Sequence, residues 1–141
     1  MIVHQDPMQL IRGFGTFFVG EEALTSQDLN FLMLVLMSHF SVGSVAGAIY
    51  HVTMNKYFAD RSYEWKLMMG VAWGLAIWIG SFYLVISWVQ PMMVGEAFIL
   101  DMIPFWVAAL THIVYGVTIG LLEPIGRFTP YQVANGGSDH G

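Results

Sequence analysis

The sequence contains no cysteine and very little charge. Of its 141 residues, 11% are charged, whereas a typical soluble domain carries about 25%. Without cysteine the chain cannot form disulfides, thiolate metal sites or iron–sulfur clusters, and it has no thiol nucleophile. So few charged side chains cannot cover a water-facing surface, which excludes the soluble globular and disordered classes.

Basic residues are the scarcest charged group. Five Lys and Arg against ten Asp and Glu give a net charge of −5, the opposite of the basic surface that binds nucleic acid. Nucleic acid is therefore not an expected partner. What the chain has in abundance is apolar: 56% of the residues are hydrophobic and the mean hydropathy is +0.61. These values predict a membrane protein.

Three stretches lack Asp, Glu, Lys and Arg for long enough to cross a bilayer, at residues 29–53, 67–89 and 103–122. About 20 apolar residues span the roughly 30 Å of hydrocarbon. Each such segment must be helical, because lipid satisfies none of its backbone polar groups. We predict an all-α polytopic membrane protein with a three-helix transmembrane domain at 29–122, followed by a polar carboxyl-terminal tail at 123–141.

The amino-terminal segment, residues 1–28, does not contain a full span. Its apolar part, residues 8–20, has only 13 residues, and Arg12 and three glycines interrupt it. That length predicts an interfacial or re-entrant piece.

Capping and helix-breaking residues mark the ends of the spans. Asp28 is a capping residue ahead of the first span, and Pro104 is expected in the first turn of the third. Gln90-Pro91 is expected to end the second span, and Glu123-Pro124 the third.

Basic residues predict the orientation in the membrane. The loop after the first span carries Lys56, Arg61 and Lys66, whereas residues 90–102 carry no basic residue. The positive-inside rule then places the amino terminus outside and the carboxyl terminus in the cytoplasm.

The first and third spans share an internal repeat. A hydroxyl residue, a histidine and two glycines recur at identical spacing, as Ser38-His39-x3-Gly43-x3-Gly47 and Thr111-His112-x3-Gly116-x3-Gly120. Both spans run in the same direction, and at 1.5 Å per residue both histidines lie roughly 14–15 Å into the membrane. The repeat is typical of a parallel duplication.

The glycines of the repeat favour helix packing, because small residues four apart let helix backbones approach in lipid. The second span carries the same spacing. The candidate helix-packing residues are Gly43, Gly47, Gly70, Gly74, Gly116 and Gly120.

The two histidines form a candidate intramembrane pair, since an ionisable residue inside a membrane usually faces protein and often has a role. The favoured interpretation is one hydrogen bond from each of His39 and His112 to a neighbouring helix. The alternatives are axial ligation of a haem b iron, and metal binding or proton transfer. No metal-ligand or catalytic motif appears, so no catalytic or metal residues are assigned and no enzyme activity is expected.

Three glycine-bearing segments resemble the YagU-like family of small prokaryotic inner-membrane proteins, at residues 39–50, 70–78 and 112–120. The resemblance covers about 29–122. It implies a four-helix membrane protein of the prokaryotic cell membrane without an assigned activity. This chain lacks a full first helix, which a neighbouring subunit would complete.

These observations predict a non-catalytic accessory subunit of a larger prokaryotic membrane complex, an energy-transducing oxidoreductase. Its partners would be other integral-membrane subunits and the lipid bilayer, with lipid or quinone in a groove. The alternatives are a small haem b electron carrier and a small transporter or channel. Polar termini of this kind are expected to be ordered by partner proteins.

The predicted topology can be tested by cysteine labelling, because the chain has no native cysteine. Cysteine introduced at Ser62 should react only with reagent on the cytoplasmic side, and cysteine at Gly95 only with reagent outside. Labelling of both positions from one side would contradict the three-span topology.

Overall fold

Three long apolar helices account for most of the chain. The structure is a computed structural model and describes residues 7–125. Those residues form helices only: α1 (Pro7–Val19), the 3-10 helix η1 (Gly20–Thr25), α2 (Leu29–Tyr57), α3 (Tyr63–Ile79), the π-helix η2 (Gly80–Val89), α4 (Gln90–Val94), α5 (Phe98–Met102) and α6 (Phe105–Leu122). The segments Leu29–Tyr57, Tyr63–Val94 and Phe105–Leu122 are each long and apolar enough to cross a membrane. The predicted all-α, multi-pass membrane class is confirmed.

Capping side chains set the beginnings of the long helices. The Asp28 carboxylate accepts a hydrogen bond of 2.9 Å from the backbone N–H of Asn30, and the Ser62 hydroxyl accepts one of 3.3 Å from that of Trp65. Each satisfies a donor that the first turn leaves unpaired. Pro104 directly precedes α6 in the N-cap position, so the prediction that it lies in the first turn is wrong by one position.

The second span continues beyond Gln90-Pro91, so the prediction that it ends there is wrong. The helical path runs to Val94 because the last part of this span is a π-helix, in which the N–H of Gln90 donates to the carbonyl of Val85. In an α-helix the Pro91 ring would clash with the carbonyl four residues before it. The wider π turn changes that register, and the chain passes the proline without a break.

Helices α3 and α6 approach each other at their backbones, through two glycines from each. A Cβ added at Gly70 would lie 2.5 Å from the carbonyl oxygen of Gly116, and one added at Gly74 would overlap the carbonyl oxygen of His112. From the other side, a Cβ at Gly120 would lie 3.1 Å from the Cα of Leu67. At these glycine positions no side chain larger than hydrogen fits between the two helices. The contact between α3 and α6 is the most extensive helix contact in the described chain.

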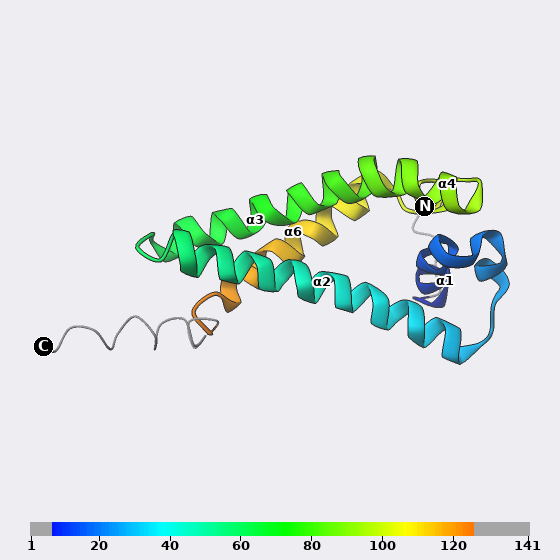
Figure 1. Ribbon diagram of the computed structural model, residues 1–141, viewed down its shortest axis with the longest axis horizontal. Coiled ribbons are helices and arrows are strands. Elements are labelled where there is room, and N and C mark those ends of the chain that lie inside the picture. The colour runs from blue at the N-terminus through cyan, green and yellow to red at the C-terminus, as the bar shows by residue number, and fades with distance from the viewer. Residues whose placement is uncertain (1–6, 126–141) are drawn as a thin grey trace, which may run out of the picture.

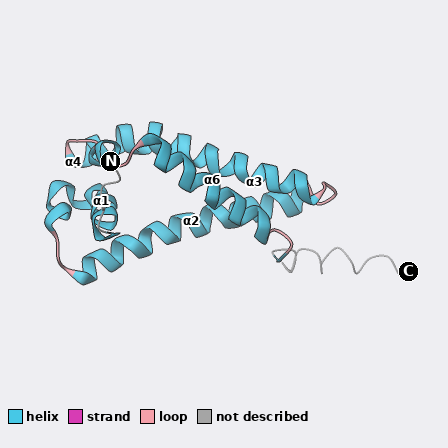
Figure 2. Cartoon of the chain, turned by 180° about the vertical axis from the view of Figure 1, so that it is seen from behind, coloured by secondary structure: helices cyan, strands magenta, loops and turns pink. Residues whose placement is uncertain are grey.

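Helix α2 lies beside this pair at one end and diverges from it at the other, as Figures 1 and 2 show. Its contacts with the pair lie in its second half, where the Trp73 Nε1–H donates a hydrogen bond of 3.1 Å to the carbonyl of Ala46. At 29 residues, α2 is about 43 Å long, which exceeds the hydrocarbon thickness. Tilting or extension beyond the bilayer accommodates such a length.

Helix α1 lies near the beginning of α2 and near α4, at the end where α2 diverges (Figure 1). A buried hydrogen-bond chain holds it there: the Gln90 side-chain amide donates to the Thr16 hydroxyl over 3.0 Å, and its oxygen accepts from the N–H of Ile99 over 3.2 Å. Phe14 and Phe17 add apolar contacts with the core around Trp78. The predicted segment 8–20 thus lies in the packed helix α1 except for Gly20, which begins η1. Its interfacial or re-entrant placement in the membrane stays a prediction.

Most of the predicted carboxyl-terminal tail lies outside the described residues, and one predicted labelling position needs to change. The polar tail at 123–141 is described only as far as Ile125, and its ordering by partners stays a prediction. Gly95 adopts a φ of 89°, a conformation in which a cysteine is strained. The adjacent exposed residue Glu96 is therefore the better position for outside labelling.

The glycine contact predicts a large effect of one methyl group. Gly74→Ala and Gly116→Ala should each destabilise the protein by about 1–3 kcal/mol or more, because the added carbon meets backbone that cannot rotate away. The measurement is reversible unfolding in detergent micelles. Gly80→Ala is the matched control, since nothing lies within 4 Å of its added Cβ. Equal stability of all three variants would show that the contact does not determine stability.

Candidate functional site

The inward face of α2 carries the first half of the repeat. His39, Gly43, Gly47 and Tyr50 follow one another at spacings of four, four and three residues, which places them on one side of an α-helix. The Tyr115 hydroxyl of α6 donates a hydrogen bond of 2.6 Å to the carbonyl of Gly43, and a Cβ at Gly47 would lie 3.3 Å from that hydroxyl oxygen. These two glycines therefore accommodate a tyrosine ring.

The six candidate packing glycines thus divide into two groups. Gly70, Gly74, Gly116 and Gly120 form the backbone contact between α3 and α6, whereas Gly43 and Gly47 face the ring of Tyr115. The two halves of the repeat have the same sequence spacing and different neighbours. The repeat does not pack α2 against α6 glycine to glycine.

His112 is held by its own helix. Its Nδ1 lies 2.8 Å from the carbonyl oxygen of Ala108, one turn earlier in α6. A carbonyl oxygen can only accept, so Nδ1 carries a proton and donates.

His39 is held by an aromatic contact. Its ring stacks on that of Phe14 from α1, with the ring centroids 4.4 Å apart and an angle of 19° between the planes. The structure thus holds His39 of α2 against α1 and His112 against its own helix.

The favoured hydrogen bonds to neighbouring helices are not what the structure shows. Within residues 7–125, His112 bonds a carbonyl of its own helix and the His39 side chain makes no hydrogen bond. The His39 ring stacks instead on the Phe14 ring that α1 contributes.

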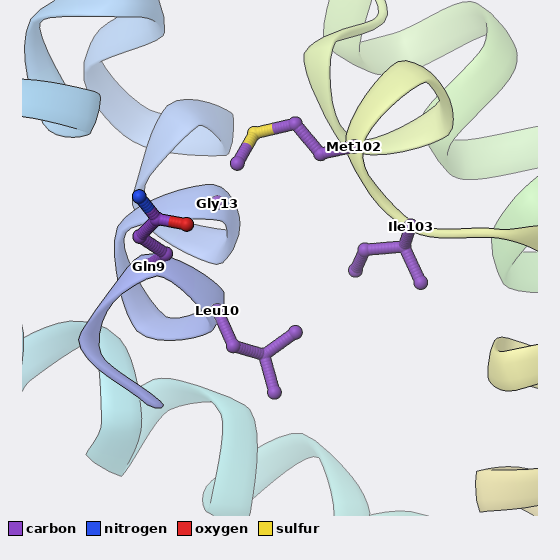
Figure 3. Close-up of a pocket in the computed structure, with 5 residues that line it drawn as sticks. All are labelled: Gln9, Leu10, Gly13, Met102 and Ile103. Carbon is purple, nitrogen blue, oxygen red and sulfur yellow. The ribbon is translucent and has the colours of Figure 1, made fainter. Parts of the chain in front are cut away.

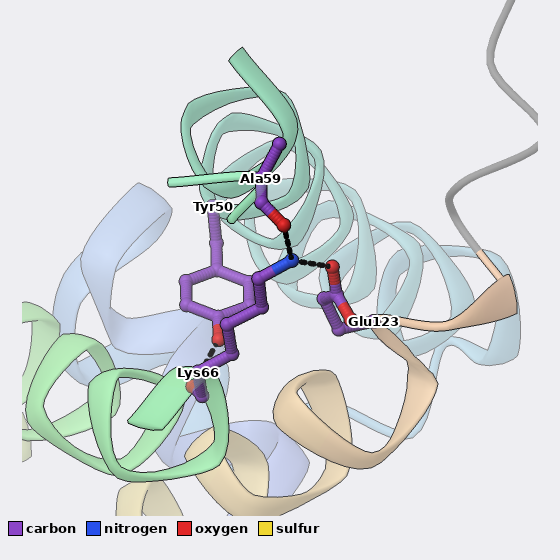
Figure 4. Close-up of polar contacts among 4 residues, drawn as sticks. All are labelled: Tyr50, Ala59, Lys66 and Glu123. Carbon is purple, nitrogen blue, oxygen red and sulfur yellow. Dashed lines mark hydrogen bonds and ion pairs between the residues drawn. The ribbon is translucent and has the colours of Figure 1, made fainter. Parts of the chain in front are cut away.

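A buried ion pair lies at the opposite end of the bundle, and sequence reasoning missed it. Lys66 Nζ donates to the Glu123 carboxylate over 2.8 Å, and the two side chains are 1% and 0% exposed. The same ammonium reaches the Ala59 carbonyl at 3.4 Å, and the Tyr50 hydroxyl donates to the Lys66 carbonyl (Figure 4). These contacts join α2, the α2–α3 loop, α3 and the end of α6.

The ion pair has a consequence for the predicted orientation. The sequence predicts a loop position for Lys66, but Lys66 belongs to α3 and is paired with a carboxylate. Lys56 and Arg61 remain exposed at this end, so the charge asymmetry persists with fewer unpaired cations. The topology itself signalled the pair, because a cation that begins one antiparallel helix faces the residue that ends the next.

A small pocket between α1 and α5 has almost no polar side chains in its lining (Figure 3). It is lined by Gln9, Leu10, Gly13, Met102 and Ile103. One amide among apolar side chains can contact an acyl chain or a water molecule but supplies no acid, base or nucleophile. The expected lipid or quinone therefore stays a prediction.

Metal-binding groups are few in the described chain. No cluster of three or more His, Cys, Asp or Glu residues able to hold a metal ion occurs within residues 7–125.

No family model matches the sequence, and no curated protein or solved structure is significantly similar to it. The YagU-like resemblance stays a prediction.

Removing Lys66 should strongly destabilise the protein, because it leaves a buried carboxylate without its cation. We expect Lys66→Met to cost about 3–5 kcal/mol, measured by unfolding in detergent micelles. The double variant Lys66→Met/Glu123→Gln should recover much of that loss, since it removes both charges. Lys56→Met is the control, because Lys56 is exposed beside Tyr57. A double variant as unstable as Lys66→Met would argue against the ion pair.

Proposed function

We propose that the chain is a non-catalytic accessory subunit of a larger prokaryotic membrane complex, and that the outward face of α2 is its docking surface. The observation that carries this proposal is a second small-residue face on α2. Ser41, Ser44 and Ala48 follow one another at helical spacing on a side of α2 that is turned roughly 110° from Gly43 and Gly47, and all three are exposed.

This chain already uses small residues to bring helices together. Between α3 and α6, glycines at the same kind of spacing allow backbone contact. On α2 the face of Ser41, Ser44 and Ala48 has no helix of residues 7–125 against it. Large apolar side chains flank it, such as Met37 at 59% and Val45 at 61% exposure. A transmembrane helix of another protein fits such a face by packing and by hydrogen bonds to the two serines.

The kind of complex is part of the proposal. We propose an energy-transducing oxidoreductase, in which small subunits without catalytic groups pack around larger membrane subunits. The described residues are compatible with a supporting role, because four buried polar side chains are used in contacts between helices: Lys66 with Glu123, and Gln90 with Thr16. The orientation with a cytoplasmic carboxyl terminus belongs to the same proposal.

Docking through α2 predicts that bulk on its outward face weakens association. Ser44→Leu and Ala48→Leu should reduce the recovery of partner proteins with a tagged chain, purified from its native membrane in mild detergent and quantified by mass spectrometry. Both variants should still insert into the membrane, since leucine is more apolar than the serine or alanine that it replaces. Val42→Leu, on the flank of the same helix and 69% exposed, is the matched control.

Two results would contradict the proposal. Purification of the wild-type chain without any stoichiometric membrane partner would remove the accessory role. Equal partner recovery for all variants would leave the role possible through another surface and reject α2 as the docking face.

A further inference from the structure

Arg12 is a cation in an apolar helix, and most of its hydrogen-bond donors are unused within the described residues. It is the only Lys or Arg among residues 1–55, and its side chain is half-buried. Its Nε donates a hydrogen bond of 2.8 Å to the carbonyl of Ser26. The four N–H groups of its two terminal nitrogens have no partner within residues 7–125. One contact thus orients the guanidinium, and its outer edge can still bind an anion.

A cavity lies directly against Arg12. It is lined by Gln9, Arg12, Leu24 and Met102, and its volume is about 190 Å³. One water molecule needs only roughly 10–15 Å³, so the cavity has room for a larger polar group. A guanidinium and an amide are groups that donate hydrogen bonds to the oxygens of a phosphate.

This cavity adjoins the pocket between α1 and α5 that Figure 3 shows. The two share Gln9 and Met102 in their linings, and the pocket adds Leu10, Gly13 and Ile103. A Cβ at Gly13 would lie 3.3 Å from the terminal methyl carbon of Met102, so the Met102 side chain packs against α1 where the two spaces meet. A ligand that fills both spaces has a polar group at one end and a hydrocarbon chain at the other.

The position of Arg12 along the spans matches the depth of lipid headgroups. Ser26, whose carbonyl accepts the hydrogen bond from Arg12, lies three residues before Leu29, where α2 begins. The 29 residues of α2 extend about 43 Å, which matches the roughly 40–45 Å of a bilayer with its polar headgroup regions. The beginning of α2, and Arg12 beside it, therefore lies at the level of the lipid phosphates.

Acidic residues near the cavity favour one kind of headgroup. Glu22 and Asp101 are both exposed, and they lie two residues from Leu24 and one residue from Met102 in the chain. Additional negative charge on a ligand is repelled by these carboxylates, whereas an ammonium group is attracted to them.

We propose that this site binds a phospholipid with a zwitterionic headgroup. Its phosphate contacts the guanidinium of Arg12, which presents parallel N–H donors to two phosphate oxygens. An acyl chain lies in the adjoining pocket against Leu10, Met102 and Ile103. The site is formed by α1, η1 and α5, so the proposal does not depend on the docking surface of α2.

The experiment uses the full chain in mild detergent and measures bound lipid by native mass spectrometry. The probes are palmitoyl-oleoyl phosphatidylethanolamine and the phosphatidylglycerol with the same chains. We expect one phosphatidylethanolamine per chain at saturation and weaker retention of phosphatidylglycerol. Arg12→Gln should weaken retention by about tenfold or more, because it removes charge-assisted hydrogen bonds. Arg61→Gln is the matched control, since Arg61 is exposed in the α2–α3 loop at the other end of the bundle.

Misfolding is separated from loss of the site by measurements on the wild-type chain. A phosphatidylethanolamine with a photoreactive diazirine in one acyl chain should label residues 9–13 or 102–103, identified by peptide mass spectrometry. Labelling confined to other residues would overturn the proposal, as would equal retention of lipid by wild type and Arg12→Gln. Displacement of the lipid by inorganic phosphate at the same concentration would overturn it in favour of a site for free anions. Stronger retention of phosphatidylglycerol would overturn the zwitterionic headgroup.

Discussion

The backbone contact between α3 and α6 is the constraint on which the remaining packing depends. In lipid there is no hydrophobic drive that brings helices together, so close approach of backbones must supply the attraction. Four glycines make that approach possible, and the Cβ positions of Gly70 and Gly74 are already taken by the carbonyl oxygens of the partner helix. Helix α2 is then placed by single side chains that extend from this rigid pair, such as Trp73 of α3 and Tyr115 of α6, which donate hydrogen bonds to carbonyls of α2.

Buried polar contacts fix both ends of the bundle. At one end the Lys66–Glu123 ion pair joins the α2–α3 hairpin to α6, and at the other Gln90 joins α1 to α4 and α5. A buried charge or amide has no water to solvate it, so losing one partner costs more than the contact itself contributes. Between these ends α2 is tied to the pair only in its second half, and the histidines lie where it begins to diverge.

The number, type and order of the spans could be predicted from the sequence, because charge-free stretches of 20 or more residues have one solution in a bilayer. The end of the second span could not, since the π-helix that carries the chain past Pro91 leaves no signal in apolar periodicity. The ion pair was also missed. Lys66 reads as a loop cation until α3 is seen to begin at Tyr63, and Glu123 reads as a helix end until α6 is seen beside it.

The sequence by itself determined that this is an all-α membrane protein and that His39 and His112 occupy equivalent positions in a repeated sequence pattern. Only the tertiary structure decided what the repeated spacing does. The glycines of α6 meet a helix backbone and those of α2 meet the Tyr115 ring. The physical reason is that helical spacing fixes which residues share a face of one helix. Which element packs against that face depends on how the three long helices and α1 are arranged around one another. The stacking of Phe14 on His39, from a segment outside the spans, is a contact that no periodicity encodes.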